Sequence, residues 1–215
     1  MVARLSRSDK VRDFFWAFLW LLCLAAFIAL GVRAARGGVL QADIHIVRWL
    51  QTGPQPVGWL SDFANGVNGA LPLAAIILVT CGLLLLHRLL TEAALVAGTL
   101  LVRLLQDGAK YIFNEPRPSP DLVRVTDFPG SPGYPSGHVT GTVTLFLLLV
   151  AFAPLVAGPR VTLVLRVFSV FMIGWIAIAR MWVGAHWPTD CLGGYLFAAI
   201  YLIPALVLSS RQRAR

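Results

Sequence analysis

Apolar residues fill this 215-residue chain in long unbroken blocks rather than at alternating positions. A helix needs about 20 mostly apolar residues to cross the hydrocarbon core of a bilayer. The blocks of that length that contain no Asp, Glu, Lys or Arg are Phe14–Val32, Phe63–His87, Val139–Pro159 and Cys191–Ser210. This pattern predicts an all-α, polytopic membrane protein.

Two further blocks are interrupted by charged residues near their ends. Leu89–Gln106 contains Glu92 and Arg103, and Val161–Ala179 contains Arg166. Long charged side chains near the end of a span can reach the headgroup region, so both blocks still qualify as spans. The expectation is therefore six transmembrane helices that form a single domain over residues 1–215.

Composition supports the membrane class and excludes others. Hydrophobic residues make up 58% of the chain and charged residues 13%, whereas soluble domains are about 25% charged. The net charge of +8 does not indicate a nucleic-acid partner, because the basic residues gather at the chain ends and in short loops. Cys23, Cys81 and Cys191 have no paired spacing and are expected to be small apolar residues. No cofactor, metal or obligate protein partner is expected.

Basic residues also predict the orientation in the membrane. A cytoplasmic N-terminus with alternating spans leaves nine Lys and Arg inside and seven outside. Without Lys110, Arg117 and Arg180, which have a chemical role below, the ratio is nine to four, so both termini are expected in the cytoplasm. The first apolar run is longer than the core of a signal peptide, about 7–15 residues, so we expect a retained helix.

Three segments then lie on the outer face, at about residues 33–62, 107–136 and 180–190. In the first, Ile44, Val47 and Leu50 have helical spacing, which fits either a short amphipathic helix in the membrane interface or an ordinary loop. The second is rich in Pro and Gly and is expected to be an irregular loop. The third is short.

The second and third outer segments together carry two histidines, three cations and a carboxylate. Between His138 and Arg180 lie 41 residues, enough for two crossings and a tight turn. Two crossings return the chain to the same face of the membrane. We therefore expect these side chains to meet in one site.

The types of residue suit an anionic, phosphate-like group. Cations neutralise its oxygens, and the planar fork of Arg matches two oxygens at once. Ser136 precedes the fourth span at the N-cap position, so the free N–H groups of Gly137 and His138 would point outward at a helix N-terminus. Gly137 has no side chain to block their approach to an anion. The cations are Lys110, Arg117 and Arg180.

His186 and Asp190 suit nucleophilic chemistry. They lie four residues apart, one helical turn, and Pro188 between them suits the first turn of a helix. A carboxylate that binds one ring nitrogen fixes the tautomer and leaves the other nitrogen free to attack. His138 is then available to protonate the leaving oxygen.

Three motifs carry these residues: Lys110-x6-Arg117-Pro118, then Pro135-Ser136-Gly137-His138, then Arg180-x5-His186-x3-Asp190. Together they resemble the signature of the type 2 phosphatidic acid phosphatase superfamily, and the six-span layout extends the likeness over the whole chain. One position differs, because Ala179 stands where the family has a Ser before the arginine. The hydroxyl that this Ser supplies in the family is therefore missing here.

The resemblance implies a metal-independent phosphohydrolase without a cofactor, which acts on a membrane lipid. In it, the residue matching His186 becomes a phosphohistidine, the residue matching Asp190 orients it, and the residue matching His138 serves the leaving group and then the water. The residues implied to hold the phosphate are those matching Lys110, Arg117, Ser136, Gly137 and Arg180. These roles agree with the dominance of positioning and charge stabilisation in phosphoryl transfer.

The other charged residues near this site are expected to be structural or solvated. Arg103 and Asp107, at i and i+4, are expected to form an ion pair. The long loop also carries charges that could read a headgroup, but a plain solvated loop is preferred for Glu115, Asp121, Arg124 and Asp127.

Several functions compete for such a sequence. The leading hypothesis is hydrolysis of a lipid phosphate or diphosphate at the outer face of a bacterial inner membrane, with undecaprenyl diphosphate favoured. Phosphatidylglycerophosphate and phosphatidate are alternative substrates, and a lipid phosphotransferase is an alternative reaction. A vanadium-dependent haloperoxidase is disfavoured by the long spans. A phospholipid-binding transporter is disfavoured because the charges gather at one face and no inverted repeat is seen.

Overall fold

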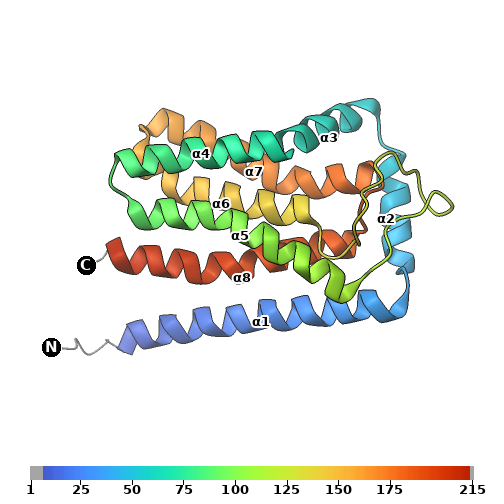
Figure 1. Cartoon of the computed structure of the whole chain (residues 1–215), viewed down its shortest axis with the longest axis horizontal. Helices are drawn as coiled ribbons and strands as arrows, with labels where there is room; N and C mark the ends of the chain where they lie inside the picture. Colours follow the sequence, from blue (N-terminus) through green and yellow to red (C-terminus); the bar gives the residue numbers. More distant parts are fainter. Residues whose placement is uncertain (1–6, 214–215) are drawn as a thin grey trace.

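The computed structural model describes residues 7–213, which fold into eight α-helices without any strand in that range (Figure 1). The all-α class expected from the sequence is confirmed. The helices are α1 (Arg7–Gly37), α2 (Gln41–Gln51), α3 (Gln55–Val67), α4 (Ala70–Leu86), α5 (Leu90–Phe113), α6 (Gly137–Val156), α7 (Pro159–Trp182) and α8 (Pro188–Arg213).

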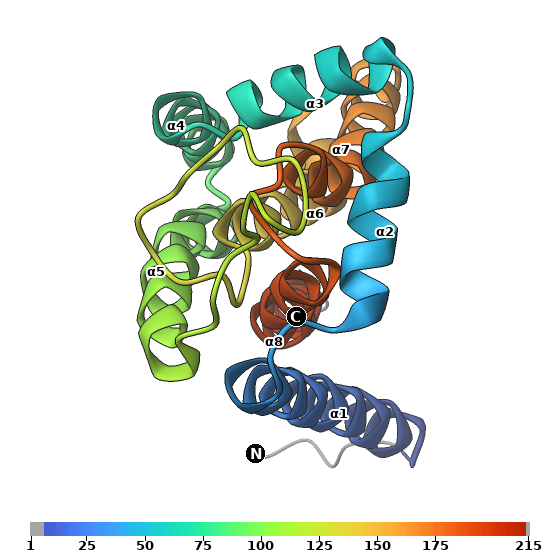
Figure 2. The same ribbon diagram turned by 90° about the vertical axis from the view of Figure 1, so that its right-hand side faces the viewer.

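The long helices run side by side, and α2 lies across one end of the bundle (Figures 1 and 2). Helix α1 begins and helix α8 ends at the opposite end of the bundle (Figure 1). Helix α6 is central: it packs against α4, α5, α7 and α8, and 61% of its apolar stretch is buried, against 11–33% in α1, α7 and α8. Helix α1 packs on the outside of α8.

Four helices of the described chain, α1, α6, α7 and α8, are long and apolar enough to cross a membrane. A fifth candidate is the pair α3 and α4, if the bent pair is one span. Helix α5 is 24 residues long but carries several charged residues, from Glu92 to Lys110. The polytopic membrane class is therefore supported, but the expected number of six spans is not confirmed, since four or five are found among the described residues.

The apolar block Phe63–His87 is not the one continuous helix expected. The chain bends by 58° between α3 and α4. Asn68 donates its Nδ2 to the Ala64 carbonyl at 2.8 Å and so completes the end of α3. Gly69 is the N-cap of α4, and Pro72 occupies its first turn, where the missing N–H has no intrahelical partner to lose. Hydropathy alone could not reveal this break, because both sides of it are apolar.

Helix α5 extends further than the loop expected from about residue 107. It continues to Phe113 and ends at Asn114, whose left-handed backbone (φ 49°) caps the helix. Lys110 therefore lies in the last turn of a helix rather than in a loop.

The segment around Ile44 is a helix, α2, and its apolar face contacts protein. Ile44 and Val47 are buried in a cluster with Val123 of the long loop and with Trp187. Asp43 on the same helix accepts hydrogen bonds from the Thr189 hydroxyl (2.7 Å) and backbone N–H (3.3 Å). Helix α2 thus ties the long loop to the beginning of α8.

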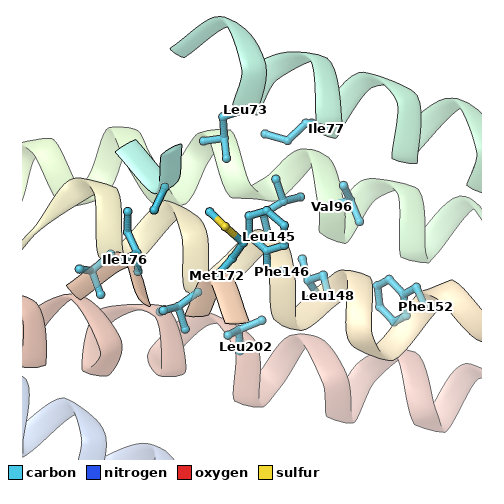
Figure 3. Close-up of a cluster of buried hydrophobic side chains, with 14 of the residues drawn as sticks. Leu73, Ile77, Val96, Leu145, Phe146, Leu148, Phe152, Met172, Ile176 and Leu202 are labelled. Atoms are coloured by element: carbon cyan, nitrogen blue, oxygen red, sulfur yellow. The ribbon is translucent and has the colours of Figure 1, made fainter. Parts of the chain in front are cut away.

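A single main cluster of buried apolar side chains lies between α4, α5, α6, α7 and α8 (Figure 3). Its members include Leu145 and Phe152 of α6, Met172 and Ile176 of α7, and Leu202 of α8. Outward-facing apolar side chains on the same helices stay exposed, as expected where lipid replaces water as the solvent.

Helices α6 and α8 lie close together beside the site, at Gly194. A Cβ atom at Gly194 would lie 2.9 Å from the Ser136 carbonyl oxygen and 2.9 Å from the Val139 Cβ. Both neighbours are rigid, so any side chain here would push the two helices apart.

We predict that Gly194→Ala destabilises the protein, because overpacking costs about 1–3 kcal/mol and outweighs the gain in helix propensity of up to about 1 kcal/mol. The expected fall in melting temperature in detergent is roughly 2–6 °C. Gly82→Ala on α4 is the matched control, since nothing lies within 4 Å of a Cβ atom there. Equal melting temperatures for the two variants would contradict this account of the α6–α8 contact.

Candidate active site

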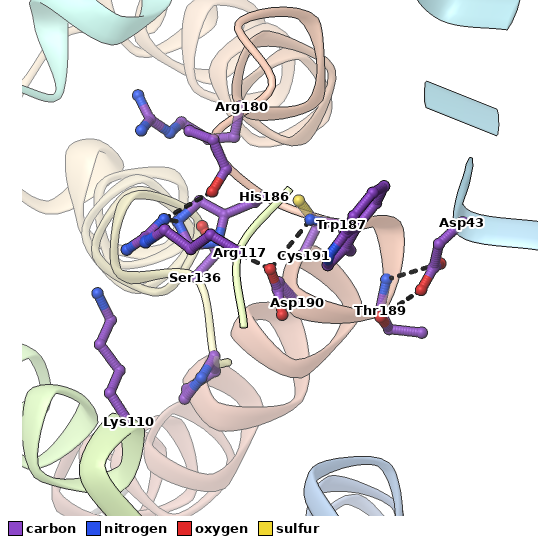
Figure 4. A network of polar contacts seen from close by, with 12 residues as sticks. Asp43, Lys110, Arg117, Ser136, Arg180, His186, Trp187, Thr189, Asp190 and Cys191 are labelled. Carbon is purple, nitrogen blue, oxygen red and sulfur yellow. Dashed lines mark hydrogen bonds and ion pairs between the residues drawn. The ribbon is translucent and has the colours of Figure 1, made fainter. Parts of the chain in front are cut away.

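The end of the bundle crossed by α2 holds all eight residues that the sequence analysis selected (Figures 1 and 4). Four elements and two loops contribute them. They are Lys110 in the last turn of α5, Arg117 in the long loop, Ser136 before α6, Gly137 and His138 in the first turn of α6, Arg180 in the last turn of α7, His186 in the loop that follows, and Asp190 in the first turn of α8.

His186 and Asp190 form a fully buried pair, with Nδ1 and Oδ2 3.1 Å apart. The same carboxylate oxygen accepts the backbone N–H of Trp187 at 3.0 Å. Pro188 opens α8 and places Asp190 one turn after His186, so the local helix start sets the geometry of the pair.

The second ring nitrogen of His186 faces Arg117. Arg117 Nη1 lies 3.1 Å from His186 Nε2 (Figure 4). A guanidinium can only donate hydrogen bonds, so Nε2 is the acceptor and the ring proton lies on Nδ1, where it is donated to Asp190. The Nε2 lone pair therefore points toward a cation and toward whatever that cation binds.

Burial keeps the His186 ring neutral. Desolvation lowers the pKa of His186 to about 4, while the hydrogen bond to Asp190 and its negative charge act in the opposite direction. Because the folded pKa is depressed, the ring becomes charged only when the pH falls toward 4. At neutral pH Nε2 therefore keeps the unprotonated lone pair that nucleophilic attack requires.

Arg117 is held in place by the long loop and by the loop after α7. Its Nε donates to the Ser131 carbonyl (2.5 Å), Nη1 to the Ala185 carbonyl (2.6 Å) and Nη2 to the Ser131 hydroxyl (3.2 Å). Lys110 Nζ donates to the same hydroxyl at 3.1 Å. Ser131 thus aligns two cations, a role that no sequence signal indicated.

Arg180 is 2% exposed and is positioned by two partners. Its Nη2 pairs with Asp127 Oδ2 at 2.7 Å, and Nη1 donates to Asn65 Oδ1 at 3.0 Å. The expectation that Asp127 is a solvated loop residue is therefore wrong. Arg180 Nε is buried and has no acceptor among the described residues, so it can donate to a bound anion.

The beginning of α6 offers further hydrogen-bond donors. Ser136 stands at the N-cap position, but its hydroxyl makes no capping bond and is buried without a partner in the described chain. The first N–H groups of α6, at Gly137 and His138, have no intrahelical acceptor. A hydroxyl and free N–H groups at a helix N-terminus suit an anion.

His138 is half-buried, and its ring makes no hydrogen bond to any residue within 7–213. The ring lies within electrostatic range of Arg180 and His186, and also of Arg103 and Lys110. It is therefore the group of the site that is free to exchange a proton with a ligand.

Glu115, expected to be a solvated loop residue, is instead buried beside Asp190. The Glu115 carboxyl is within hydrogen-bond reach of the Asp190 carboxylate. Glu115 Oε2 and Asp190 Oδ1 are both buried and receive no N–H or hydroxyl donor from the described chain. Burial, the hydrogen bond to Asp190 and the Asp190 charge raise the pKa of Glu115, so Glu115 is protonated and donates to Asp190.

Ala179, the position that departs from the family motif, is fully buried in the main core cluster. Its side chain is a methyl group, so position 179 contributes no hydroxyl to the site. No group of three or more His, Cys, Asp and Glu side chains is arranged to hold a metal ion within residues 7–213.

The chain was compared with known proteins. It resembles the crystal structure of a transmembrane PAP2-type phosphatidylglycerolphosphate phosphatase from Bacillus subtilis, with a TM-score of 0.72 and 18% identity over 89% of this chain and 96% of that one. At this identity the likeness shows a shared fold. No curated protein sequence matches the chain.

The model of the PAP2 superfamily matches residues 91–214, more than half of the chain. The matched stretch contains all three motifs and every one of the eight site residues described above. The family expected from the motifs is therefore confirmed, and the phosphatase class expected with it agrees with both comparisons. The chain belongs to the PAP2 superfamily.

Proposed function

We propose that this protein is an integral membrane lipid phosphatase that removes a phosphate group through a phosphohistidine at His186. One observation carries the proposal: the Nε2 lone pair of a neutral, buried His186 faces Arg117, while Nδ1 is fixed by Asp190. A nucleophile in this position, beside three cations and a helix N-terminus, suits attack on a phosphoryl group.

In the first step, His186 Nε2 attacks phosphorus and the bond from phosphorus to the lipid oxygen breaks. The leaving oxygen takes a proton from His138, and Asp190 stabilises the positive charge that develops on the His186 ring. In the second step, His138 takes a proton from water as the water oxygen attacks phosphorus. The phosphorus–nitrogen bond then breaks, inorganic phosphate leaves and His186 is neutral again.

The phosphate oxygens would be held by groups already oriented for them. Arg180 Nε and the Ser136 hydroxyl are buried donors without partners in the described chain, and Lys110 and Arg117 converge through Ser131. With the N–H of Gly137 they surround the equatorial oxygens, where charge stabilisation matters most for this reaction.

The substrate is proposed at the level of a lipid phosphate or diphosphate. The Bacillus subtilis neighbour is described as a phosphatidylglycerolphosphate phosphatase, which makes that lipid a candidate here. Undecaprenyl diphosphate, favoured from the sequence, has no support from the comparisons and stays a candidate only. The same phosphohistidine could pass its phosphoryl group to another acceptor, and product analysis separates such a phosphotransferase from a hydrolase.

We also propose six crossings of the plasma membrane, with both termini in the cytoplasm and the site on the outer face. Helix α1 begins and helix α8 ends at the end of the bundle away from the site, which supports an even number of crossings (Figure 1). Four apolar helices and the bent pair α3–α4 give five, and α5 runs between the same two ends and gives six. The positive-inside bias supports cytoplasmic termini.

One test of the proposed function concerns the nucleophile. Detergent-purified protein should release phosphate from a panel of lipid phosphates in the presence of EDTA, and His186→Ala should lower kcat by at least ~10³-fold. His45→Ala, an exposed histidine of α2 at the same end of the bundle, is the matched control and should keep full activity. Undiminished release by His186→Ala would overturn the phosphohistidine mechanism. Loss of release with EDTA would overturn its independence of metal.

Another test of the proposed function concerns Glu115 as a positioning residue for Asp190. Glu115→Gln keeps a neutral hydrogen-bond donor and should retain activity at neutral pH. Glu115→Ala leaves Asp190 Oδ1 without a donor and should lower kcat about 10-fold or more, since a buried, unsatisfied charged group costs at least about 1–3 kcal/mol.

The pH profile distinguishes this role from a merely structural one. The raised pKa of Glu115 means that its proton is present at neutral pH and is lost as the pH rises through the folded pKa. Wild type should therefore lose activity more steeply on the alkaline side than Glu115→Gln, in which only groups shared by both proteins, such as Lys110, lose a proton. The same alkaline decline in both proteins would show that the proton of Glu115 does not matter.

A further inference from the structure

Arg103 on α5 is a cation near the site that the mechanism above does not use. It lies seven residues, about two helical turns, before Lys110 on the same helix. The ion pair expected with Asp107 is not formed; Asp107 instead lies 3.9 Å from Lys110 Nζ. Arg103 Nη1 is buried and has no hydrogen-bond partner among residues 7–213.

The Arg103 guanidinium lies against the beginning of α6. A Cβ atom at Gly141 would lie 2.8 Å from Arg103 Nη1 and 3.4 Å from its Cδ, so only glycine lets the side chain lie this close. Gly141 follows His138 by three residues and shares its helix face. The Arg103 charge accordingly acts on the His138 ring, together with the charges of Arg180 and Lys110.

The geometry of the proposed reaction indicates on which side of phosphorus Arg103 lies. The attacking and leaving groups lie roughly in line on opposite sides of phosphorus. His186 is the attacking group, so His138, which protonates the leaving oxygen, lies on the leaving side. Arg103 therefore lies on the side of the leaving fragment, deeper toward the lipid than the cations that hold the transferred phosphate.

A buried guanidinium donor without an acceptor is costly, and an anion in the leaving fragment would satisfy it. We propose that Arg103 binds a second phosphate group, carried by the leaving fragment, and so selects substrates whose product is itself anionic. This inference rests on the proposed function. A lipid diphosphate and a phosphomonoester attached to a phosphodiester both meet the requirement. Phosphatidate, whose leaving fragment is an uncharged alcohol, does not.

The test compares pairs of substrates that differ in that second phosphate. Wild type should prefer farnesyl diphosphate to farnesyl monophosphate, and phosphatidylglycerophosphate to phosphatidate. Arg103→Gln should lower kcat/KM for the member with the second phosphate about 10- to 100-fold and leave the other member within about threefold. The pair that shows the selective loss tells whether the second phosphate is directly linked or lies beyond a glycerol.

Arg166→Gln is the matched control, because Arg166 is an exposed arginine of α7 whose Nε donates to the Val150 carbonyl. It should change no substrate. Retained activity of Arg103→Gln on the monophosphate shows that the variant is folded. Equal losses on both members of each pair, or no loss on either, would overturn the proposal. If Arg103→Gln is inactive on everything, Arg103→Lys should restore the preference, and failure to do so would overturn it too.

Binding separates this inference from the proposed function. Inorganic diphosphate should bind wild type more tightly than inorganic phosphate does, and Arg103→Gln should remove that difference while phosphate binding is kept. This readout needs no turnover, so it tests Arg103 even if no lipid releases phosphate. Unchanged diphosphate binding in Arg103→Gln would contradict the assignment.

Discussion

The hydrogen bond from the Ser136 N–H to the Asp190 carbonyl, 3.0 Å long, joins the beginnings of α6 and α8. The N-terminus of α6 supplies the anion-binding groups, and the first turn of α8 supplies the carboxylate that orients His186. Their separation is fixed by this bond and by the absence of a side chain at Gly194 just below it. The proposed phosphate-binding groups and the proposed nucleophile are thereby held in register by two elements more than 50 residues apart.

A second constraint on the structure is that many charged side chains must lie together at the end of an apolar bundle. Buried charges are tolerated when each has a partner. Here Arg180 has Asp127, Arg117 has two backbone carbonyls, and Asp190 has His186 and the proton of Glu115. The donors left over, such as the Ser136 hydroxyl, point to where a ligand can satisfy them. The unsatisfied groups therefore mark the binding site within the polar network.

The helical class, and the meeting of the eight candidate site residues at one end of the bundle, could be predicted from the sequence because both depend on local signals. Long apolar runs indicate spans, and motif residues keep a fixed spacing along the chain. The sequence did not predict the features that depend on tertiary contacts. The apolar run Phe63–His87 hides a bend set by Asn68 and Gly69, and α5 continues through charged residues because its other face is packed. Glu115 and Asp127 are predicted from sequence to be solvated because their partners lie about 50 or more residues away along the chain.

Arg117 has a consequence for which molecules can react. It donates a hydrogen bond to His186 Nε2, so a cation covers the proposed nucleophile. A phosphate dianion offers that guanidinium stronger acceptors than a neutral imidazole does. A phosphate group therefore also draws Arg117 away from His186 Nε2, whereas an uncharged ester cannot. If His186 is the nucleophile as proposed, its contact with Arg117 selects against neutral electrophiles before any lipid tail is recognised.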